Sequence, residues 1–313
     1  MACSTTSNAT SAAGFSRLVT VEDATGSAER PRFLCAELEA GNIVFLPSSP
    51  IAIAPEHREL LLGHKQSGSA YHKNIAYRPV EDRITGLDGS EDKQADVLRT
   101  IMRNFSKTAM EVLAKFLVPY AENWKLDYAS FRPIEEKGRP ARLHARNDLL
   151  HFDSFPTRPT NGSRILRFFV NLNPAQDRVW LTSQTFEAFG PRFAQAGKLL
   201  QSVSGNSFTR GLRRMARTLH LPLASRPPYD EFMHRCHNAM KEDAEFQDKT
   251  PKNTWEFPPN SAWMVFTDCV SHSVLSGQYA LEQTFMVPQS ALVEPQRSPL
   301  KILEKIAACQ LTL

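Results

Sequence analysis

The sequence His151-Phe152-Asp153, followed by the run RILRFFVNL at residues 164–172, decides how the chain is interpreted. In an extended strand, successive side chains point to opposite faces, so His151 and Asp153 point to one side and Phe152 to the other. One imidazole nitrogen and one carboxylate oxygen can then converge on a single point above the sheet. The pair therefore predicts two ligands of a metal ion.

A third ligand is expected from His272, in the downstream segment TDCVSHSVLSG at residues 267–277. Two histidines and one carboxylate leave three adjacent coordination positions open, which is the ligand set of non-haem Fe(II) oxygenases. The HxD triplet alone is a weak signal, because most histidines on strands only pack or form hydrogen bonds. The surrounding sequence strengthens the interpretation.

The composition is that of a globular protein with a sizeable core. The chain has 313 residues, 42% of them hydrophobic, which suits one large domain with insertions or two smaller domains. Its net charge of +4 suits an acidic substrate or an anionic surface, but it is too weak to indicate nucleic-acid binding. The five cysteines are scattered and odd in number, which is typical of reduced thiols in the cytoplasm.

The N-terminal residues 1–30 are small and polar without periodicity, and we expect them to be disordered. Residues 1–16 lack the charged and apolar regions of a signal peptide, and no run approaches the roughly 18 apolar residues of a membrane span. Residues 31–313 are predicted to form a single domain. We expect a cytoplasmic protein, with peripheral contact to a membrane surface as an open alternative.

Hydrophobic patterns predict many short strands and one long helix. Apolar residues recur at three- and four-residue steps over residues 91–124, which is typical of a helix packed on a sheet. Further helices are expected at 55–64, in an insertion at about 186–247, and after the cap Ser298-Pro299. Strands are expected at residues 32–38, 43–47, 128–134, 141–150, 164–172, 178–181, 255–257, 262–266 and 279–287. This pattern favours a mainly β fold, a double-stranded β-helix or cupin-like jelly-roll barrel, with an outer helix layer and a helical insertion.

The segments at residues 161–173 and 272–281 resemble those of prolyl-hydroxylase-type 2-oxoglutarate dioxygenases. In that family a Lys or Arg about ten residues after the distal histidine binds the far carboxylate of 2-oxoglutarate, whereas this chain has glutamines there. A buried arginine needs an anion, so we expect Arg167, in the middle of an apolar strand, to bind this carboxylate. A structural salt bridge to a protein carboxylate is the alternative. Assisting residues are expected to be Asn171, Gln278 and Gln283.

Over residues 30 to 290 the chain resembles a narrower family, the bacterial Kdo 3-hydroxylases. The resemblance rests on HFDSFPTRP at 151–159, on residues 164–174 and on TDCVSH at 267–272. It implies a requirement for Fe(II), 2-oxoglutarate and O2, with succinate and CO2 as by-products. It also implies hydroxylation of the 3-deoxy carbon of the sugar Kdo, in the inner core of a lipopolysaccharide precursor, to give Ko.

Cations near the mouth of the barrel are expected to bind this acidic, phosphorylated substrate. Arg158 follows Asp153 by five residues, so a short loop must keep it near the metal. For each single cation, a solvated surface position is the alternative. The candidates are Lys73, Arg78, Arg132, Arg142, Arg146 and Arg158.

Two further segments need an interpretation. His234-Arg235-Cys236-His237 has no second Cys/His pair at zinc-finger spacing, so we expect it to lie on a helix without a metal. The basic segment RGLRRMAR at residues 210–217 suits an anionic membrane surface, although a solvated basic face is the commoner explanation.

Two other functions stay open at this stage. One is a protein prolyl or asparaginyl hydroxylase of the same fold, and the other is a metal-free jelly-roll module that binds sugars. Iron content and 2-oxoglutarate turnover would separate the binding module from both enzymes.

Overall fold

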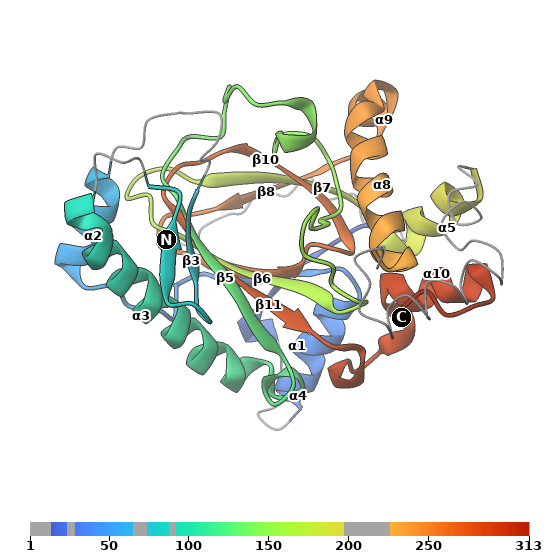
Figure 1. The fold of residues 1–313 in the computed structure, drawn as a ribbon, viewed down its shortest axis with the longest axis horizontal. Coiled ribbons are helices and arrows are strands. Elements are labelled where there is room, and N and C mark those ends of the chain that lie inside the picture. The colour runs from blue at the N-terminus through green and yellow to red at the C-terminus, as the bar shows by residue number, and fades with distance from the viewer. Residues whose placement is uncertain (1–13, 24–28, 65–73, 88–91, 197–225, 313) are drawn as a thin grey trace, which may run out of the picture.

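Two β-sheets lie face to face in the computed structural model, which describes residues 14–23, 29–64, 74–87, 92–196 and 226–312 (Figure 1). The larger sheet has the strand order β1-β2-β9-β6-β11-β5-β3-β4, and the smaller has the order β10-β7-β8. The parallel pair is β1 with β2, and the other pairs are antiparallel. The predicted jelly-roll fold is confirmed, although strand pairing does not close the described sheets into one barrel.

The larger sheet supplies most of the β-structure. Its strands are β1 (Leu18–Thr20), β2 (Ile43–Leu46), β3 (Ile75–Arg78), β4 (Arg83–Thr85), β5 (Lys125–Arg132), β6 (Arg164–Asn171), β9 (Ala262–Phe266) and β11 (Ala280–Val287). The smaller sheet consists of β7 (Arg178–Thr185), β8 (Asn253–Phe257) and β10 (Val270–Ser276).

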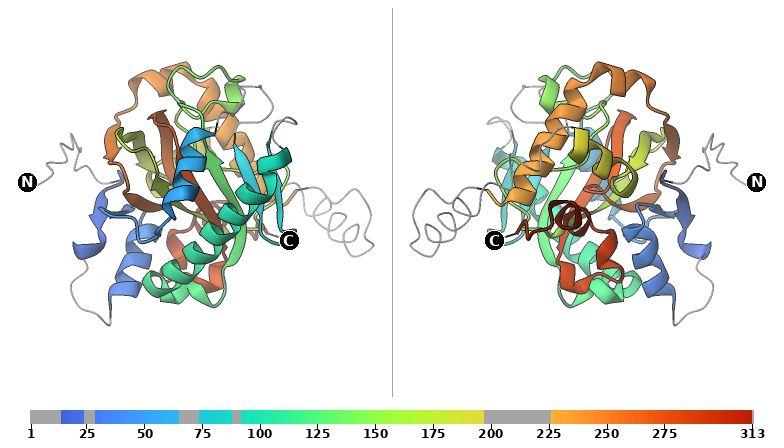
Figure 2. Two further views of the ribbon diagram at one scale, coloured as in Figure 1. Left: turned by 90° about the vertical axis from the view of Figure 1, so that its left-hand side faces the viewer. Right: turned by 90° about the vertical axis from the view of Figure 1, so that its right-hand side faces the viewer.

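Helices pack around the two sheets, and α3 crosses the outside of the larger sheet (Figure 2). They are α1 (Arg30–Glu39), α2 (Pro55–Gly63), α3 (Asp92–Phe116), α4 (Val118–Ala121), α5 (Phe186–Ala196), α8 (Pro228–Glu242), α9 (Ala244–Lys249) and α10 (Pro299–Ala307). The predicted long helix is thus confirmed as α3, and α10 begins after the predicted cap, where Ser298 Oγ accepts a hydrogen bond from Lys301 N. None of the helices in the described ranges is both long and apolar enough to cross a membrane.

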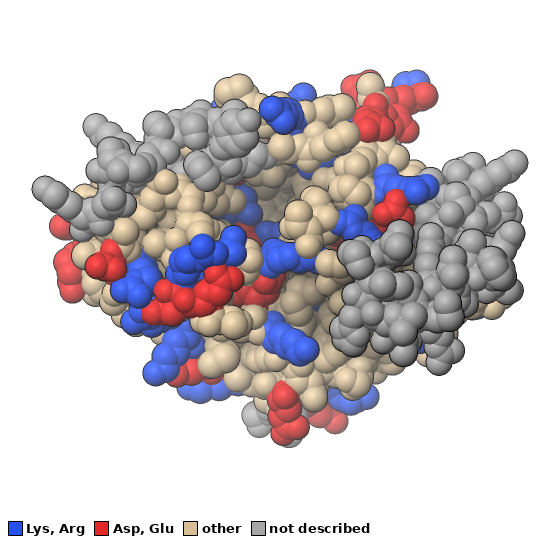
Figure 3. All heavy atoms as spheres, viewed as in Figure 1, with Lys and Arg blue, Asp and Glu red and all other residues tan. Residues whose placement is uncertain are grey.

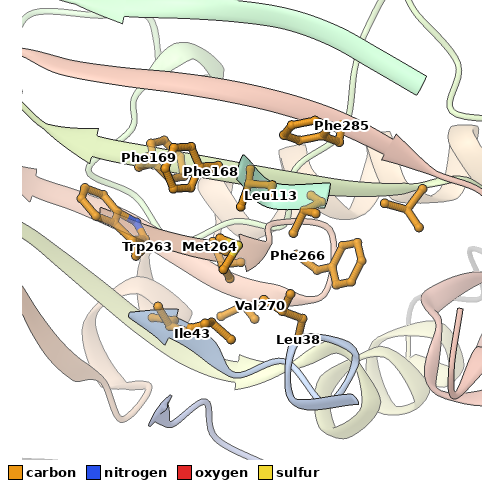
Figure 4. Packing of buried hydrophobic residues seen from close by; sticks show 14 of the residues in the cluster. Leu38, Ile43, Leu113, Phe168, Phe169, Trp263, Met264, Phe266, Val270 and Phe285 are labelled. Atoms are coloured by element: carbon orange, nitrogen blue, oxygen red, sulfur yellow. The ribbon is translucent and has the colours of Figure 1, made fainter. Parts of the chain in front are cut away.

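The core has two layers because β6 buries both of its faces. Phe168 and Phe169 are neighbours in this strand, so their side chains point in opposite directions. Phe169 lies between the sheets, where its ring is 4.9 Å from Trp180 and 5.1 Å from Trp263. Figure 4 shows the cluster that extends from β6 and β9 to residues of α1 and α3. Burial of each large apolar side chain contributes about 1.5–3 kcal/mol.

Three predictions of secondary structure are wrong. The predicted strand at residues 32–38 is helix α1, in which Leu34, Cys35 and Leu38 form one buried face at helical spacing. The predicted strand at 141–150 is a loop with the short 3-10 helix Leu143–Ala145. The predicted disorder of residues 1–30 is contradicted at Leu18–Thr20, which pairs with β2.

The predicted helical insertion is present in its described part as α5, α8 and α9. The basic segment at 210–217 lies outside the described residues. Its role at a membrane therefore stays a prediction.

Candidate metal centre and active site

The three predicted ligands come together in the structure. His151, Asp153 and His272 each offer one ligand atom, and these atoms all lie within 4.8 Å of one another. Asp153 Oδ1 is 3.4 Å from His151 Nε2 and 4.0 Å from His272 Nε2. Metal–ligand bonds of roughly 2.0–2.2 Å allow an ion to bridge atoms at such separations. Among the described residues no other group of three such side chains is found.

Backbone hydrogen bonds hold the triad in place. The HxD triplet was predicted to lie in a regular strand, but His151 forms only an isolated bridge with His272. In this bridge His151 N donates to His272 O at 3.1 Å and His272 N donates back at 3.0 Å. Asp153 N donates to Thr267 O at 2.8 Å. The two histidines are therefore direct cross-strand neighbours, and Asp153 is held above the turn that precedes β10.

Each imidazole is oriented by its own backbone. The Nδ1 atom of His151 lies 2.8 Å from Leu149 O, and that of His272 lies 2.9 Å from Val270 O. A carbonyl oxygen can only accept, so Nδ1 carries the proton and Nε2 presents its lone pair to the metal position. Such contacts fix the tautomer and the orientation of a metal-binding histidine.

The electrostatics of the site favour the metal-binding protonation states. Burial lowers the pKa of both His151 and His272, so their rings are neutral near pH 7. Burial would raise the pKa of Asp153, but the positive charge of Arg167 holds it well below the usual range. Two neutral imidazoles and one carboxylate are the donor set expected for a divalent iron site.

Two aromatic side chains support the ligands. The Trp180 ring stacks on His272, with centroids 5.3 Å apart and an interplanar angle of 18°. The His237 ring lies 4.8 Å from the ring of His151, and its Nδ1 donates to Phe152 O at 2.8 Å. Burial lowers the pKa of His237 to about 4, so this ring is also neutral. The segment 234–237 lies on α8 as predicted, but that His237 packs on a metal ligand could not be predicted from the sequence pattern.

Arg167 lies beside the metal centre, on the predicted cavity face of β6. Its Nε is 2.8 Å from Asp153 Oδ2, a charge contact that is not aligned as a hydrogen bond, and its Nη1 pairs with Glu282. Glu282 also accepts from Arg132 Nε at 2.9 Å. Glu282 follows His272 by ten residues, so a carboxylate, and not a glutamine as predicted, stands where the dioxygenase pattern has a cation. Protein carboxylates thus pair with Arg167, which was the alternative considered for this residue.

A second buried arginine was not predicted as a site residue. Alternation along β7 puts Arg178, Trp180 and Thr182 on the inner face, and Thr182 is opposite His272 in the strand register. Arg178 is 1% exposed, and its Nη1 donates to Gly277 O at 2.9 Å. Its ion-pair partner Glu136 is 3.7 Å away. Burial and the charge of Arg132 lower the pKa of Arg178 to about 10.

The inner face of β7 presents hydrogen-bond donors that the protein does not use. Arg178 Nε and Nη2 and Trp180 Nε1 are buried and have no hydrogen-bond partner among the described residues. Leaving such a group unpaired costs about 1–3 kcal/mol. Such donors favour an anionic ligand with several acceptor oxygens beside them.

The glutamine and asparagine candidates serve the backbone instead. Asn171 Nδ2 donates to Gln176 O and Phe257 O. Gln278 Nε2 donates to Pro133 O at 2.7 Å. Gln283 donates to Asp127 O at 2.9 Å and pairs with Phe168, on the face of the sheet opposite to Arg167. The structure does not bring the amide of Gln283 to the metal centre.

The predicted substrate-binding cations differ in how many of their nitrogens already bond protein carboxylates. Both Nε and Nη2 of Arg132 bond Glu282, and both Nε and Nη2 of Arg146 bond Asp148. Arg78 forms a weak pair with Glu81 at 3.4 Å, and Arg158 pairs through Nη1 with Asp127. Lys73 lies outside the described residues.

Facing sheets that hold a His-x-Asp and a distal His around one point define the class of jelly-roll, non-haem iron dioxygenases. Comparison with protein families is more specific. The model of the family described as 3-deoxy-D-manno-oct-2-ulosonic acid (Kdo) hydroxylase matches residues 21–310. The chain therefore belongs to the Kdo hydroxylase family.

Solved structures agree with this assignment. The Kdo hydroxylase KdoO, described as a non-haem Fe(II) 2-oxoglutarate-dependent dioxygenase, is 29% identical in its complex with 2-oxoglutarate and Fe(III), covering 94% of this chain and 97% of that chain with a TM-score of 0.77. Its apo structure is 29% identical, with coverage of 95% and 97% and a TM-score of 0.78. Its complex with succinate and Fe(III) is 30% identical, with coverage of 94% and 97% and a TM-score of 0.76. No match was found among curated proteins.

These comparisons confirm the predicted fold and enzyme class. They also confirm the predicted requirement for iron and 2-oxoglutarate. A Kdo-containing substrate follows from the family, which favours this function over a metal-free sugar-binding module or a protein hydroxylase.

Proposed function

We propose that this protein hydroxylates the 3-deoxy carbon of Kdo to give Ko, using Fe(II), 2-oxoglutarate and O2 and releasing succinate and CO2. The observation that carries the proposal is the triad of His151, Asp153 and His272, whose ligand atoms lie within 4.8 Å. The triad stands in a chain that matches the Kdo hydroxylase family over residues 21–310.

The triad residues would hold the iron and leave three positions free on one side of it. The bound metal supplies the oxidising chemistry with O2, and the protein supplies binding and orientation. Arg167 keeps Asp153 ionised, because its Nε lies 2.8 Å from that carboxylate. Nδ1 contacts with backbone carbonyls keep both imidazoles turned toward the metal.

The far carboxylate of 2-oxoglutarate is assigned to the unpaired donors of Arg178, with Arg167 as a second cation closer to the metal. Arg178 is four residues along β7 from Thr182, the residue opposite His272. Four residues of strand span roughly 13 Å, and the long arginine side chain reaches back over part of this distance. A five-carbon diacid that chelates the metal at one end suits this spacing. The unpaired Trp180 Nε1 lies on the same face and offers one more donor.

The substrate is proposed to be Kdo on a lipid-linked lipopolysaccharide precursor, and the protein to act in the cytoplasm in peripheral contact with the inner membrane. The net charge of +4 supports an anionic substrate. The molecule is hollowed over the gap between its two sheets, and Lys and Arg side chains gather around this hollow (Figure 3). Such charges attract an acidic sugar at long range.

The test is turnover of Kdo-lipid A by the purified protein with Fe(II), 2-oxoglutarate and air. Mass spectrometry is expected to show a gain of one oxygen on the Kdo residue, and none with His272→Ala. Succinate formation without a change in the mass of the sugar would contradict the proposed substrate.

A further inference from the structure

Five side chains alternate between arginine and aromatic residues along one side of the cavity, and we name them the arginine–aromatic row. Arg78 Cζ lies 5.1 Å from the ring centroid of Tyr128, and Arg158 Cζ lies 3.9 Å from the same centroid. Arg158 is also 4.5 Å from the ring of Phe155, and Arg167 is 5.9 Å from that ring. Each contact is within the range of cation–π attraction.

The row runs from solvent to the metal centre. The side chains of Arg78 and Arg158 are 31% and 36% exposed, whereas that of Arg167 is 14% exposed. Arg167 contacts the metal ligand Asp153 at 2.8 Å. One aromatic ring, that of Phe155, therefore separates Arg158 from an arginine that touches the metal ligand.

Arg158 keeps one hydrogen-bonding edge that no described residue occupies. Its Nη1 pairs with Asp127, and its Nε and Nη2 form no hydrogen bond with the described residues. Arg132 and Arg146 differ, because a carboxylate already takes both Nε and Nη2 of each. A free guanidinium edge is the geometry that binds a carboxylate through two parallel hydrogen bonds.

The loop that carries Arg158 is fixed at both ends. Arg226 Nη2 donates to Phe155 O at 3.2 Å, and Asp230 at the start of α8 accepts from Thr160 N at 2.6 Å and from Asn161 N at 3.1 Å. The rings of Tyr128 and Phe155 hold the guanidinium plane. Arg158 is thus oriented before any substrate binds, which lowers the entropy cost of binding.

The chemistry of the sugar places a carboxylate close to the reacting atom. In 3-deoxy-D-manno-oct-2-ulosonic acid the acid carbon is C1 and the deoxy carbon is C3. Two bonds of roughly 1.5 Å separate them, so the carboxylate carbon lies about 2.5 Å from the atom to be hydroxylated. A cation that recognises this carboxylate must therefore face the metal end of the cavity. The ring of Phe155 is what separates Arg158 from Arg167, which contacts the metal ligand Asp153.

We propose that Arg158 binds the C1 carboxylate of the acidic sugar through its free edge, while Tyr128 and Phe155 keep its guanidinium in plane and Asp127 holds its other side. This inference rests on the proposed function and adds the residue that selects for an acid at C1. Arg158 is then a specificity residue, and loss of its charge lowers discrimination between an acid and a neutral sugar.

The test compares Kdo-lipid A with its C1 methyl ester, which has the same sugar without the charge. The wild-type protein is expected to prefer the acid by roughly tenfold to a hundredfold in kcat/KM, the range of a charge-assisted pair. Arg158→Ala is expected to bring this preference close to one by raising KM for the acid, while KM for 2-oxoglutarate is unchanged. Arg158→Lys keeps the charge but loses the planar edge, so its preference should be intermediate.

Arg297→Ala is a matched control, because its side chain is 38% exposed and pairs with Glu187 and Glu294, outside the row. This variant should keep the wild-type preference. If Arg158→Ala does not fold, Arg158→Lys provides the same comparison.

If either folded Arg158 variant prefers the acid over the methyl ester as strongly as the wild type does, the role of Arg158 is overturned, whatever the total activity. The proposed function would not be affected. A wild-type protein that hydroxylates neither sugar would overturn the proposed function and the inference with it. The two failures are therefore distinguishable.

Discussion

The two ends of the cavity are built in opposite ways. At the metal end, His151 and His272 bond each other's backbone, and their Nδ1 atoms are already occupied. At the far end, Arg178 buries two donor nitrogens, Nε and Nη2, that have no hydrogen-bond partner among the described residues. The metal end is thus preorganised by the protein itself, whereas the far end is complete only with an anion. Single substitutions should separate the two ends.

The largest effect is expected at the metal end. His272→Ala removes one of three metal ligands, which should cost several kcal/mol of metal binding and lower turnover by about a thousandfold or more. Cobalt(II) binding followed by absorption spectroscopy measures the loss without relying on activity. His234→Ala, on helix α8 outside the triad, should bind cobalt(II) like the wild type. Wild-type metal affinity in His272→Ala would refute the triad.

The far end should respond through the co-substrate alone. Arg178→Met removes the unpaired donors while filling similar volume, so KM for 2-oxoglutarate is expected to rise roughly a hundredfold. Cobalt(II) affinity should stay near the wild-type value, since Arg178 contacts none of the three metal-binding residues. A loss of metal binding with unchanged KM for 2-oxoglutarate would reverse the assignment of the two ends.

Arg167 lies between the ends, so its replacement should affect both. Arg167→Ala removes the cation that lowers the pKa of Asp153 and one of two cations proposed for the co-substrate. We expect metal affinity and 2-oxoglutarate affinity each to fall by roughly tenfold to a hundredfold. Titrations of the apoprotein with cobalt(II), and of the metal-loaded protein with 2-oxoglutarate, measure the two losses. A change confined to 2-oxoglutarate would make Arg167, rather than Arg178, the principal anchor.

The smallest effect is expected at His237, whose ring packs on that of His151 and whose Nδ1 donates to Phe152 O. His237→Ala should lower metal affinity by about tenfold, as is usual for residues that orient ligands. His234→Ala, three residues earlier on α8, again serves as the control. Equal metal affinities in the two variants would show that His237 does not position the triad.

The metal ligands could be predicted from the sequence because two of them lie close together in it. His151 and Asp153 are separated by one residue, and His272 lies in a strand-like segment. Even so, the geometric reason was partly wrong, since a single bridge holds His151 beside His272 and the preceding residues are a loop. Side chains of Lys241 and Gln247 donate to backbone carbonyls of this loop. A search for strand periodicity does not detect such contacts.

The far end was missed because its residues meet only in three dimensions. Arg178 looks like the first residue of a short strand, and its inward direction depends on which sheet β7 joins. Glu282 stands where the dioxygenase family has a cation, and the positive charges beside it are those of Arg167 and Arg132 on neighbouring strands. Helix α1 was mistaken for a strand although Leu34, Cys35 and Leu38 have helical spacing. Apolar runs this short do not separate the two periods.

Isotope labelling tests the central claim most directly. The protein, loaded with Fe(II), is incubated with Kdo-lipid A and 2-oxoglutarate under ¹⁸O2, and both products are analysed by mass spectrometry. One ¹⁸O is expected in the sugar at its former deoxy carbon and one in succinate, in equal molar amounts. Labelled succinate with an unlabelled, unchanged sugar would contradict the claim.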